Sequence, residues 1–460
     1  MTRIFIEVQL VNNYTEPTEE DSTSSLPFDT EADIQTAVAK YLKVAAVSQC
    51  DVAIAMLPAG SILSRNVKKI VVSQPGVPVG SSIDVSCLRM ASLHVYKLNY
   101  EGPLAEELGG DEGDEDQGGA IGGLSSADSV VASHQWELPN AEFERAWDSL
   151  IFDSDIKEQI IAYAFSMLKF SERAVDPSVV SSNRLVFLYG PPGTGKTTLC
   201  RALAQKLTIR MSHHYTTGIF VEINSHSLFS RWFSESGKLV MKMFEKIQEI
   251  LVDPRKLVFV LIDEVESLTV ARQASMAGNE PSDAVRVVNA LLTQIDFIRR
   301  WPNVLVLTTS NLAESVDTAF MDRADVKKFI GLPSTKAIYT IMHSCIKELQ
   351  KCSILDATVG LVEDPASIGD APSPLKESSA ELLKIAEKAV GLSGRTLRKL
   401  PVLADAERPG TIEAWDLMEF LRSLALVVER EQREQRQVQQ QGGHGRAAGR
   451  GEGSAQLEIM

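Results

Sequence analysis

Features that would place a protein outside the class of intracellular globular proteins are scarce in this sequence. Its 460 residues include 5 cysteines whose spacing matches no metal-binding motif, so neither a disulfide framework nor a cysteine metal site is expected. No stretch reaches the roughly 18 consecutive apolar residues that a membrane-spanning helix needs. The first ten residues, MTRIFIEVQL, lack the apolar core and cleavage site of a secretory signal. We therefore expect no membrane span and a location in the nucleus and the cytoplasm.

Positive charge is also in short supply. The formal net charge is -15, and residues 98–144 contain no lysine or arginine. Proteins that bind nucleic acid through its phosphates carry basic surfaces, so we expect no direct nucleic-acid contact and favour a protein partner. The 44% hydrophobic and 23% charged residues are ordinary for a globular protein.

Composition and periodicity divide the chain into five segments. Residues 1–98 mix strand-like and helix-like patterns and predict a small α/β domain. Residues 99–135 are acidic and glycine-rich, which predicts a flexible tether, with an acidic interaction segment as the alternative. Strand-like and helix-like runs alternate over residues 136–333 and predict a parallel sheet flanked by helices, followed by a helix-rich subdomain at residues 334–428. Residues 429–460 are of low complexity and predict a disordered tail; its arginines leave a contact with nucleic acid as the weaker alternative.

The octapeptide GPPGTGKT at residues 190–197 matches the phosphate-binding pattern G-x-x-x-x-G-K-[ST] at every position. A strand-like run precedes it and a helix-like run follows it, so phosphates would lie at a helix N-terminus, which favours anions. Lys196 can reach the β- and γ-phosphate oxygens, and the Thr197 hydroxyl can hold Mg²⁺. The motif therefore predicts an ATP site that contains Gly190, Pro191, Pro192, Gly193, Thr194, Gly195, Lys196, Thr197 and Thr198.

Polar residues end two further apolar runs. Asp263 and Glu264 follow the run at residues 257–262, and burying a carboxylate pair there is costly unless it serves a purpose. Asp263 is placed to hold Mg²⁺ and Glu264 to polarise the attacking water. Asn311 ends the run at residues 304–310 and is a candidate contact to the γ-phosphate and the water. Taken alone, an asparagine at this position is more often a turn former.

Arg323 lies within the acidic stretch at residues 317–325. One interpretation is that it completes the site of a neighbouring subunit and neutralises charge on the transferred phosphoryl group. The alternative is a local ion pair with Asp322 or Asp325.

These motifs, in this order along the chain, resemble those of an AAA+ ATPase. The resemblance implies a P-loop core of parallel strands flanked by helices, a C-terminal helical lid and a small N-terminal α/β domain. Residues 391–395, Gly-Leu-Ser-Gly-Arg, resemble the second sensor of that family. Arg395 is therefore expected to reach the nucleotide phosphates from the lid, with a surface arginine at a helix N-terminus as the alternative. The second interface arginine that many AAA+ proteins carry has no clear place here.

Three longer stretches resemble the pachytene checkpoint subfamily, whose animal counterpart is thyroid hormone receptor-interacting protein 13. They are residues 225–238, 284–296 and 394–401. The first resembles a pore loop, which implies that Trp232 and Phe233 grip substrate in a central pore; packing at a subunit interface is the alternative. Residues 277–282 resemble a second pore loop, although a plain surface loop has the same composition.

The subfamily implies a homohexamer that binds ATP and Mg²⁺ between neighbouring subunits. Its members convert HORMA-domain proteins from a closed to an open form, sometimes through a HORMA adaptor. The substrates include meiotic chromosome-axis proteins and mitotic arrest deficient 2. Residues 1–98 are then expected to dock substrate or adaptor. The resemblance thus implies a role in meiotic checkpoint control, recombination and spindle-checkpoint silencing, at meiotic chromosomes and kinetochores.

Three alternatives share part of this pattern. An AAA+ unfoldase for another protein would have the same catalytic core and a different docking domain. A nucleotide-switched scaffold without turnover would not need Glu264. A DNA-translocating or clamp-loading protein fits poorly with the acidic charge and with the aromatic pair.

Overall fold

A computed structural model of the chain divides it into two compact units. The first contains Met1–Leu150, Asp155–Gly190 and Lys196–Phe329, and the second contains Ile151–Ser154, Pro191–Gly195 and Ile330–Met460. The structure describes residues 4–14, 30–45, 47–77, 79–85, 91–108, 130–176, 178–223, 236–266, 283–311, 318–356, 377–408 and 414–448.

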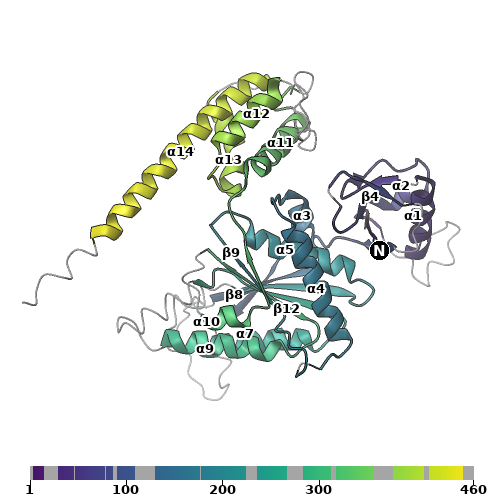
Figure 1. The fold of residues 1–460 in the computed structure, drawn as a ribbon. Helices are drawn as coiled ribbons and strands as arrows, with labels where there is room; N and C mark the ends of the chain where they lie inside the picture. Colours follow the sequence, from purple (N-terminus) through teal and green to yellow (C-terminus); the bar gives the residue numbers. More distant parts are fainter. Residues whose placement is uncertain are drawn as a thin grey trace, which may run out of the picture. The chain divides into compact units, whose positions relative to one another are not determined.

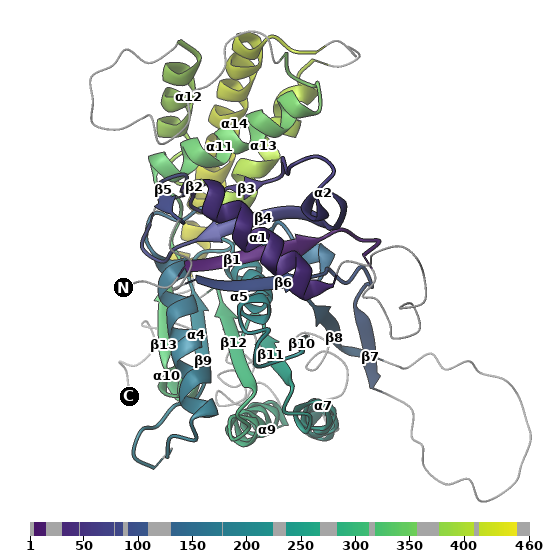
Figure 2. The ribbon, with the colours of Figure 1, turned by 90° about the vertical axis from the view of Figure 1, so that its right-hand side faces the viewer.

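The N-terminal residues of the first unit form a small α/β domain, as predicted. Its elements are β1 (Ile4–Leu10), α1 (Glu31–Ala45), β2 (Val47–Gln49), β3 (Ala53–Ile54), α2 (Ile62–Asn66), β4 (Val67–Ser73), β5 (Ser82–Asp84) and β6 (Ala91–Tyr96). In the order β3-β4-β1-β6, β1 pairs antiparallel with β4 and parallel with β6 (Figure 2). Helix α1 buries Ile34, Val38 and Leu42, which recur every fourth residue and so share one face toward this core.

The large sheet of the first unit has seven strands in the order β13-β9-β12-β11-β10-β8-β7. The strands are β7 (Leu104–Leu108), β8 (Val130–Leu138), β9 (Leu185–Tyr189), β10 (Thr217–Ile223), β11 (Lys256–Ile262), β12 (Val304–Ser310) and β13 (Val326–Phe329). The run from β13 to β10 is parallel, which confirms the predicted sheet, whereas β8 and β7 are antiparallel at one edge. The carboxyl ends of β9, β11 and β12 therefore meet at one edge of the sheet.

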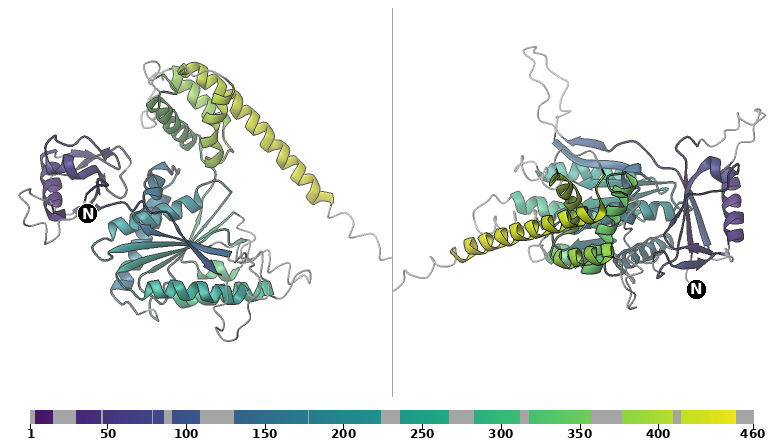
Figure 3. Two further views of the ribbon diagram at one scale, coloured as in Figure 1. Left: turned by 180° about the vertical axis from the view of Figure 1, so that it is seen from behind. Right: turned by 90° about the horizontal axis from the view of Figure 1, so that it is seen from above.

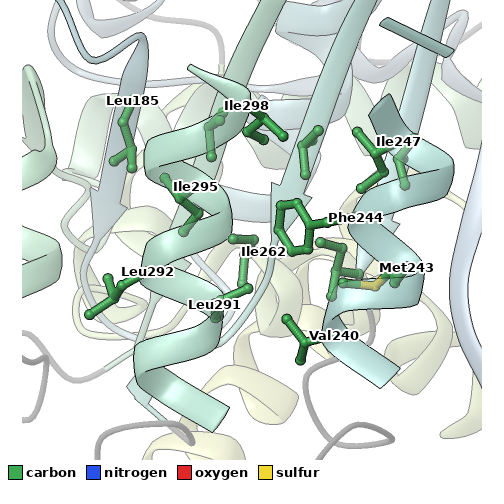
Figure 4. Packing of buried hydrophobic residues seen from close by; sticks show 14 of the residues in the cluster. Leu185, Val240, Met243, Phe244, Ile247, Ile262, Leu291, Leu292, Ile295 and Ile298 are labelled. Atoms are coloured by element: carbon green, nitrogen blue, oxygen red, sulfur yellow. The ribbon is translucent and has the colours of Figure 1, made fainter. Parts of the chain in front are cut away.

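Helices cover both faces of this sheet (Figure 1). They are α3 (Ala146–Ser149), α4 (Ile156–Glu172), α5 (Lys196–Arg210), α7 (Ser236–Leu251), α9 (Asp283–Ile298) and α10 (Thr318–Arg323), with the 3-10 turn η3 (Ala141–Phe143). Helices α7 and α9 pack on one face, where Phe244 and Ile295 belong to the same buried apolar cluster as Ile262 of β11 (Figure 4). This core fixes the positions of the strands whose ends carry the polar residues.

Two edge strands were not predicted. Residues 99–135 were predicted to be a flexible tether, but β7 lies wholly within that segment and β8 begins inside it. Trp136 pairs with Phe220 and Leu138 with Gly218, so β8 extends the sheet beyond β10. The prediction was wrong here because it weighed the acidic composition and overlooked short apolar stretches that tertiary pairing turns into strands.

The second unit is built from four described helices around one apolar cluster. They are α11 (Thr335–Lys351), α12 (Glu377–Lys388), α13 (Gly394–Ala406) and α14 (Leu417–Ala448), which confirms the predicted helical lid. Helix α14 extends to Ala448, so the prediction of a disordered tail from residue 429 was wrong for residues 429–448, whereas residues 449–460 lie outside the described part (Figure 3). Glutamate, arginine and glutamine favour helix, and Arg430 pairs with Glu407 at 2.6 Å, which ties this part of α14 to the end of α13. No described helix, α14 included, is apolar enough over a bilayer's thickness to cross a membrane.

Candidate active site

Lys196 lies at the start of α5, directly after the phosphate loop. Its Nζ atom donates to the carbonyl of Gly190 at 2.8 Å, and the side chain is only 5% exposed. The Gly190 N–H donates in turn to the carbonyl of Ser310, at the end of β12 (3.2 Å). The ammonium group is thus fixed at the N-terminus of a 15-residue helix, where phosphate oxygens are favoured.

The loop residues Pro191–Gly195 belong to the second unit together with α13. The Arg395 N–H donates to the carbonyl of Gly193 at 3.0 Å. Gly193 has a φ of 76°, and a Cβ atom there would lie 2.6 Å from the Ser393 Oγ atom. The structure therefore joins the backbone of Arg395 to that of Gly193, while contact of the Arg395 side chain with phosphates stays a prediction. The positive φ and the close approach of Ser393 favour glycine at position 193.

Thr197 and Asp263 form the candidate Mg²⁺ site. The Thr197 hydroxyl donates to the Asp263 carboxylate, with Oγ1 at 3.1 Å from Oδ1 and 3.0 Å from Oδ2. A hydroxyl and a carboxylate close together are oxygen ligands of the kind that Mg²⁺ prefers, so these residues fit the ion. The structure brings the two predicted metal residues together from α5 and the end of β11.

Glu264 and Asn311 are also brought together, because β11 and β12 are neighbours in the sheet. The Asn311 side-chain amide donates to Glu264 Oε1 at 3.3 Å. Glu264 has a φ of 55°, which a residue with a side chain rarely adopts. A strained backbone at the carboxylate expected to polarise water is consistent with a functional position.

Two residues that the sequence analysis did not single out hold this arrangement. The Thr309 hydroxyl accepts the N–H of Glu264 at 3.2 Å and donates to Asp263 Oδ1. Glu266 accepts the backbone N–H of Asn311 at 3.0 Å. The polar ending of an otherwise apolar strand, Thr-Thr-Ser at residues 308–310, was the available signal for the first, whereas the second had no signal of its own.

Arg323 forms an ion pair with Asp296, a residue that the sequence analysis did not consider as its partner. Its Nε and Nη2 atoms lie 3.1 Å and 2.8 Å from the two carboxylate oxygens of Asp296 on α9. Asp325 accepts the backbone N–H of Asn183 at 2.8 Å. The structure thus shows Arg323 in an ion pair within its own subunit.

The remaining predicted site residues cannot be placed. Trp232 and Phe233 lie outside the described residues, and so does the candidate second pore loop at residues 277–282. Their assignment stays a prediction.

Comparisons with known proteins agree with this geometry. The ATPase family associated with various cellular activities (AAA) matches residues 186–332, and the TRIP13-like AAA+ ATPase lid C-terminal domain matches residues 334–432. The chain is similar to the pachytene checkpoint protein 2 homolog of Xenopus tropicalis, with 50% identity over 384 residues, which cover 82% of this chain and 84% of the relative. The pachytene checkpoint protein 2 homolog of Homo sapiens is 48% identical over 384 residues, which cover 82% of this chain and 84% of the relative.

A solved structure, that of C. elegans PCH-2, shares the fold with a TM-score of 0.74 and 35% identity, covering 94% of this chain and 99% of that one. The AAA match and these relatives indicate nucleotide binding and turnover, which excludes the scaffold alternative. The chain therefore belongs to the pachytene checkpoint protein 2 family of AAA ATPases and is an ATP-hydrolysing enzyme.

Proposed function

We propose that this chain is the subunit of a homohexamer that uses ATP hydrolysis to convert HORMA-domain proteins from a closed to an open form. The observation that supports it best is the contact between Asn311 and Glu264, 3.3 Å apart, beside the pair formed by Thr197 and Asp263. This site lies in a chain that is 50% identical to a pachytene checkpoint protein 2 homolog over 82% of its length.

Each predicted site residue has a role in this proposal. Lys196 and the loop N–H groups bind the phosphates, and Arg395 contacts them from the lid. Mg²⁺, held by Thr197 and Asp263, would offset the negative charge of the phosphate oxygens. The carboxylate of Glu264 accepts a proton of the attacking water, and the Asn311 amide orients that carboxylate.

The mechanical part of the proposal rests on the family resemblance. Arg323 of one subunit neutralises charge on the phosphoryl group bound by the next, which links hydrolysis to movement of the ring. Trp232 and Phe233 grip an extended segment of the substrate. Residues 1–98 dock the substrate or its adaptor, and the enzyme acts in the nucleus and the cytoplasm, at meiotic chromosomes and kinetochores.

The test is the ATPase rate of the full chain with and without a purified, closed HORMA-domain protein, each with and without its adaptor. Glu264→Gln is the blank: it is expected to bind ATP and assemble but to turn over at least about 100-fold more slowly. Glu245→Gln, the same change at an exposed position of α7, is the matched control. Faster turnover together with conversion of closed to open substrate would support the proposal.

Two other outcomes would contradict it. Basal turnover that no HORMA-domain protein stimulates would favour an unfoldase for another protein. Normal turnover in Glu264→Gln would overturn the assigned role of the carboxylate.

A further inference from the structure

Glu266 is a buried carboxylate next to the hydrolytic residues. It follows Glu264 by two positions, and its side chain is 9% exposed. Its Oε1 atom accepts the backbone N–H of Asn311 at 3.0 Å. Among the described residues, its Oε2 atom has no hydrogen-bond partner. The bond to Asn311 is therefore the identified interaction of this carboxylate.

Two carboxylates that follow β11 contact Asn311, one at its backbone and one at its side chain. Its backbone N–H meets Glu266, and its side-chain amide meets Glu264 Oε1 at 3.3 Å. The pairing of β12 with β9 ends at Ser310, so the Asn311 N–H lies just beyond the strand ladder. Glu266 therefore accepts the first backbone N–H after β12, beyond the pairing of that strand with β9.

This hydrogen bond joins the residue that follows β12 to a carboxylate that follows β11. A charged acceptor makes a stronger hydrogen bond than a neutral one, and the low exposure of Glu266 shields the bond from water. A strong, shielded bond at the Asn311 backbone is suited to limit the directions that the Asn311 side chain can take.

We infer that Glu266 is a positioning residue for ATP hydrolysis: it fixes the backbone of Asn311 so that the Asn311 amide orients the carboxylate of Glu264. The inference rests on the proposed roles of Asn311 and Glu264. Glu266 itself touches neither nucleotide nor water in this scheme, so it acts on the catalytic step and not on ATP binding.

The experiment compares the full-length variants Glu266→Met, Glu266→Gln, Asn311→Ala and the double variant Glu266→Met with Asn311→Ala. Methionine fills a similar volume and removes the acceptor, whereas glutamine keeps one. We expect Glu266→Met to lower kcat for ATP about 10-fold, equivalent to ~1.4 kcal/mol, with KM within about twofold. Glu266→Gln should retain most of the activity, within about threefold of the unaltered protein.

The double variant separates positioning from a general structural role. If Glu266 acts through Asn311, the double variant should be no slower than Asn311→Ala alone, because coupled residues are not additive. Thr308→Val is the matched control: it removes a buried hydrogen bond of β12 to the Val186 carbonyl (3.3 Å) and should leave kcat unchanged. Circular dichroism and the thermal midpoint of each variant establish that it is folded.

Three results would overturn the inference. They are an unchanged kcat in Glu266→Met, fully additive losses in the double variant, or a Glu266→Gln variant as slow as Glu266→Met. A failure of the proposed function looks different, because Glu264→Gln and Asn311→Ala would then themselves hydrolyse ATP normally. If Glu266→Met does not fold, Glu266→Ala, which also removes the acceptor, takes its place in the same comparisons with and without Asn311→Ala.

Discussion

Arg323 and Asp296 form a two-point ion pair within one subunit. The Nε and Nη2 atoms of the arginine lie 3.1 Å and 2.8 Å from the two oxygens of the aspartate, and the side chains are 28% and 32% exposed. The pair joins the end of α10 to α9, and it holds the Arg323 guanidinium at a partly exposed position. To reach a phosphoryl group in a neighbouring subunit, Arg323 must exchange this partner.

A mixing experiment tests whether Arg323 acts on a neighbour. Arg323→Ala and Lys196→Ala subunits should each lose at least about 100-fold in turnover when assayed alone. Mixed rings should recover part of the activity, because some sites then combine an intact Lys196 with an intact Arg323 from the adjacent subunit. The ATPase rate is measured against the mixing ratio, with Arg300→Ala, at an exposed position, as the control for the loss of an arginine. Absence of recovery in rings shown by native mass spectrometry to be mixed would place the action of Arg323 in its own subunit.

Removing the Thr309 hydroxyl should slow hydrolysis without abolishing ATP binding. The hydroxyl accepts the backbone N–H of Glu264 at 3.2 Å and donates to Asp263, so it positions the Glu264 backbone and orients the Asp263 carboxylate. Thr309→Val keeps the shape of the side chain, and we expect kcat to fall about 10-fold; Thr309→Ser should restore most of it. Steady-state kinetics at several Mg²⁺ concentrations make the measurement. Equal rates for the valine and serine variants would show that the hydroxyl has no such role.

Gly193→Ala should weaken nucleotide binding by at least about 10-fold. The new Cβ atom would lie 2.6 Å from Ser393 Oγ and 3.1 Å from Arg395 Cβ, in a backbone conformation with a φ of 76°. Gly60→Ala is the matched control, since its φ is 74° and no atom lies within 4 Å of its new Cβ atom. The control should lose about 1 kcal/mol of stability and no affinity. Affinity is measured with a fluorescent ATP analogue, and equal affinities of the two variants would contradict the close packing of Gly193.

Glu7 is expected to stabilise the first unit in a pH-dependent way. It is 3% exposed and pairs with Lys206 at 2.6 Å and Arg210 at 2.7 Å, both on α5. Burial raises its pKa, but the two cations and their hydrogen bonds outweigh burial and lower the pKa from 4.5 to about 2. Because the folded pKa is the lower one, the stabilisation is complete above pH 4.5 and is lost as the pH falls toward 2.

The corresponding measurement is urea unfolding of Glu7→Gln and of the unaltered protein between pH 7 and pH 3. At pH 7 the variant should be less stable by about 3 kcal/mol, because two buried cations lose their charged partner. The difference should shrink once the pH falls below about 4.5. Glu101→Gln, at an exposed position, controls for the loss of a carboxylate. A difference that stays constant with pH would show that Glu7 is not titrating as described.

The nucleotide-site residues were predictable because their signals are local. Residues 190–197 carry a complete motif. Asp263 follows an uninterrupted apolar run, which is typical of a buried parallel strand, and Asn311 follows a strand-like run that begins with four apolar residues. Strands β7 and β8 were missed because their partners lie far along the chain: β8 pairs with β10, some eighty residues later. The acidic, glycine-rich composition of residues 99–135 predicts a solvated segment. Part of it forms β7 and β8 because these strands pair within the large sheet.

The sequence by itself determined the P-loop and the parallel character of the core, because both follow from short-range patterns of glycine, charge and apolar residues, and its longer motifs indicated the family by resemblance. The tertiary structure alone decided which side chains meet at the strand ends. Thr309 and Glu266 have no motif of their own, and Asp296 ends the family-like stretch at residues 284–296, which assigned it no role. Each of the three lies more than twenty residues from its partner. Their roles arise because parallel strands and packed helices bring distant residues within hydrogen-bond distance, and hydrogen bonds depend on the arrangement of atoms in space and not on separation along the chain.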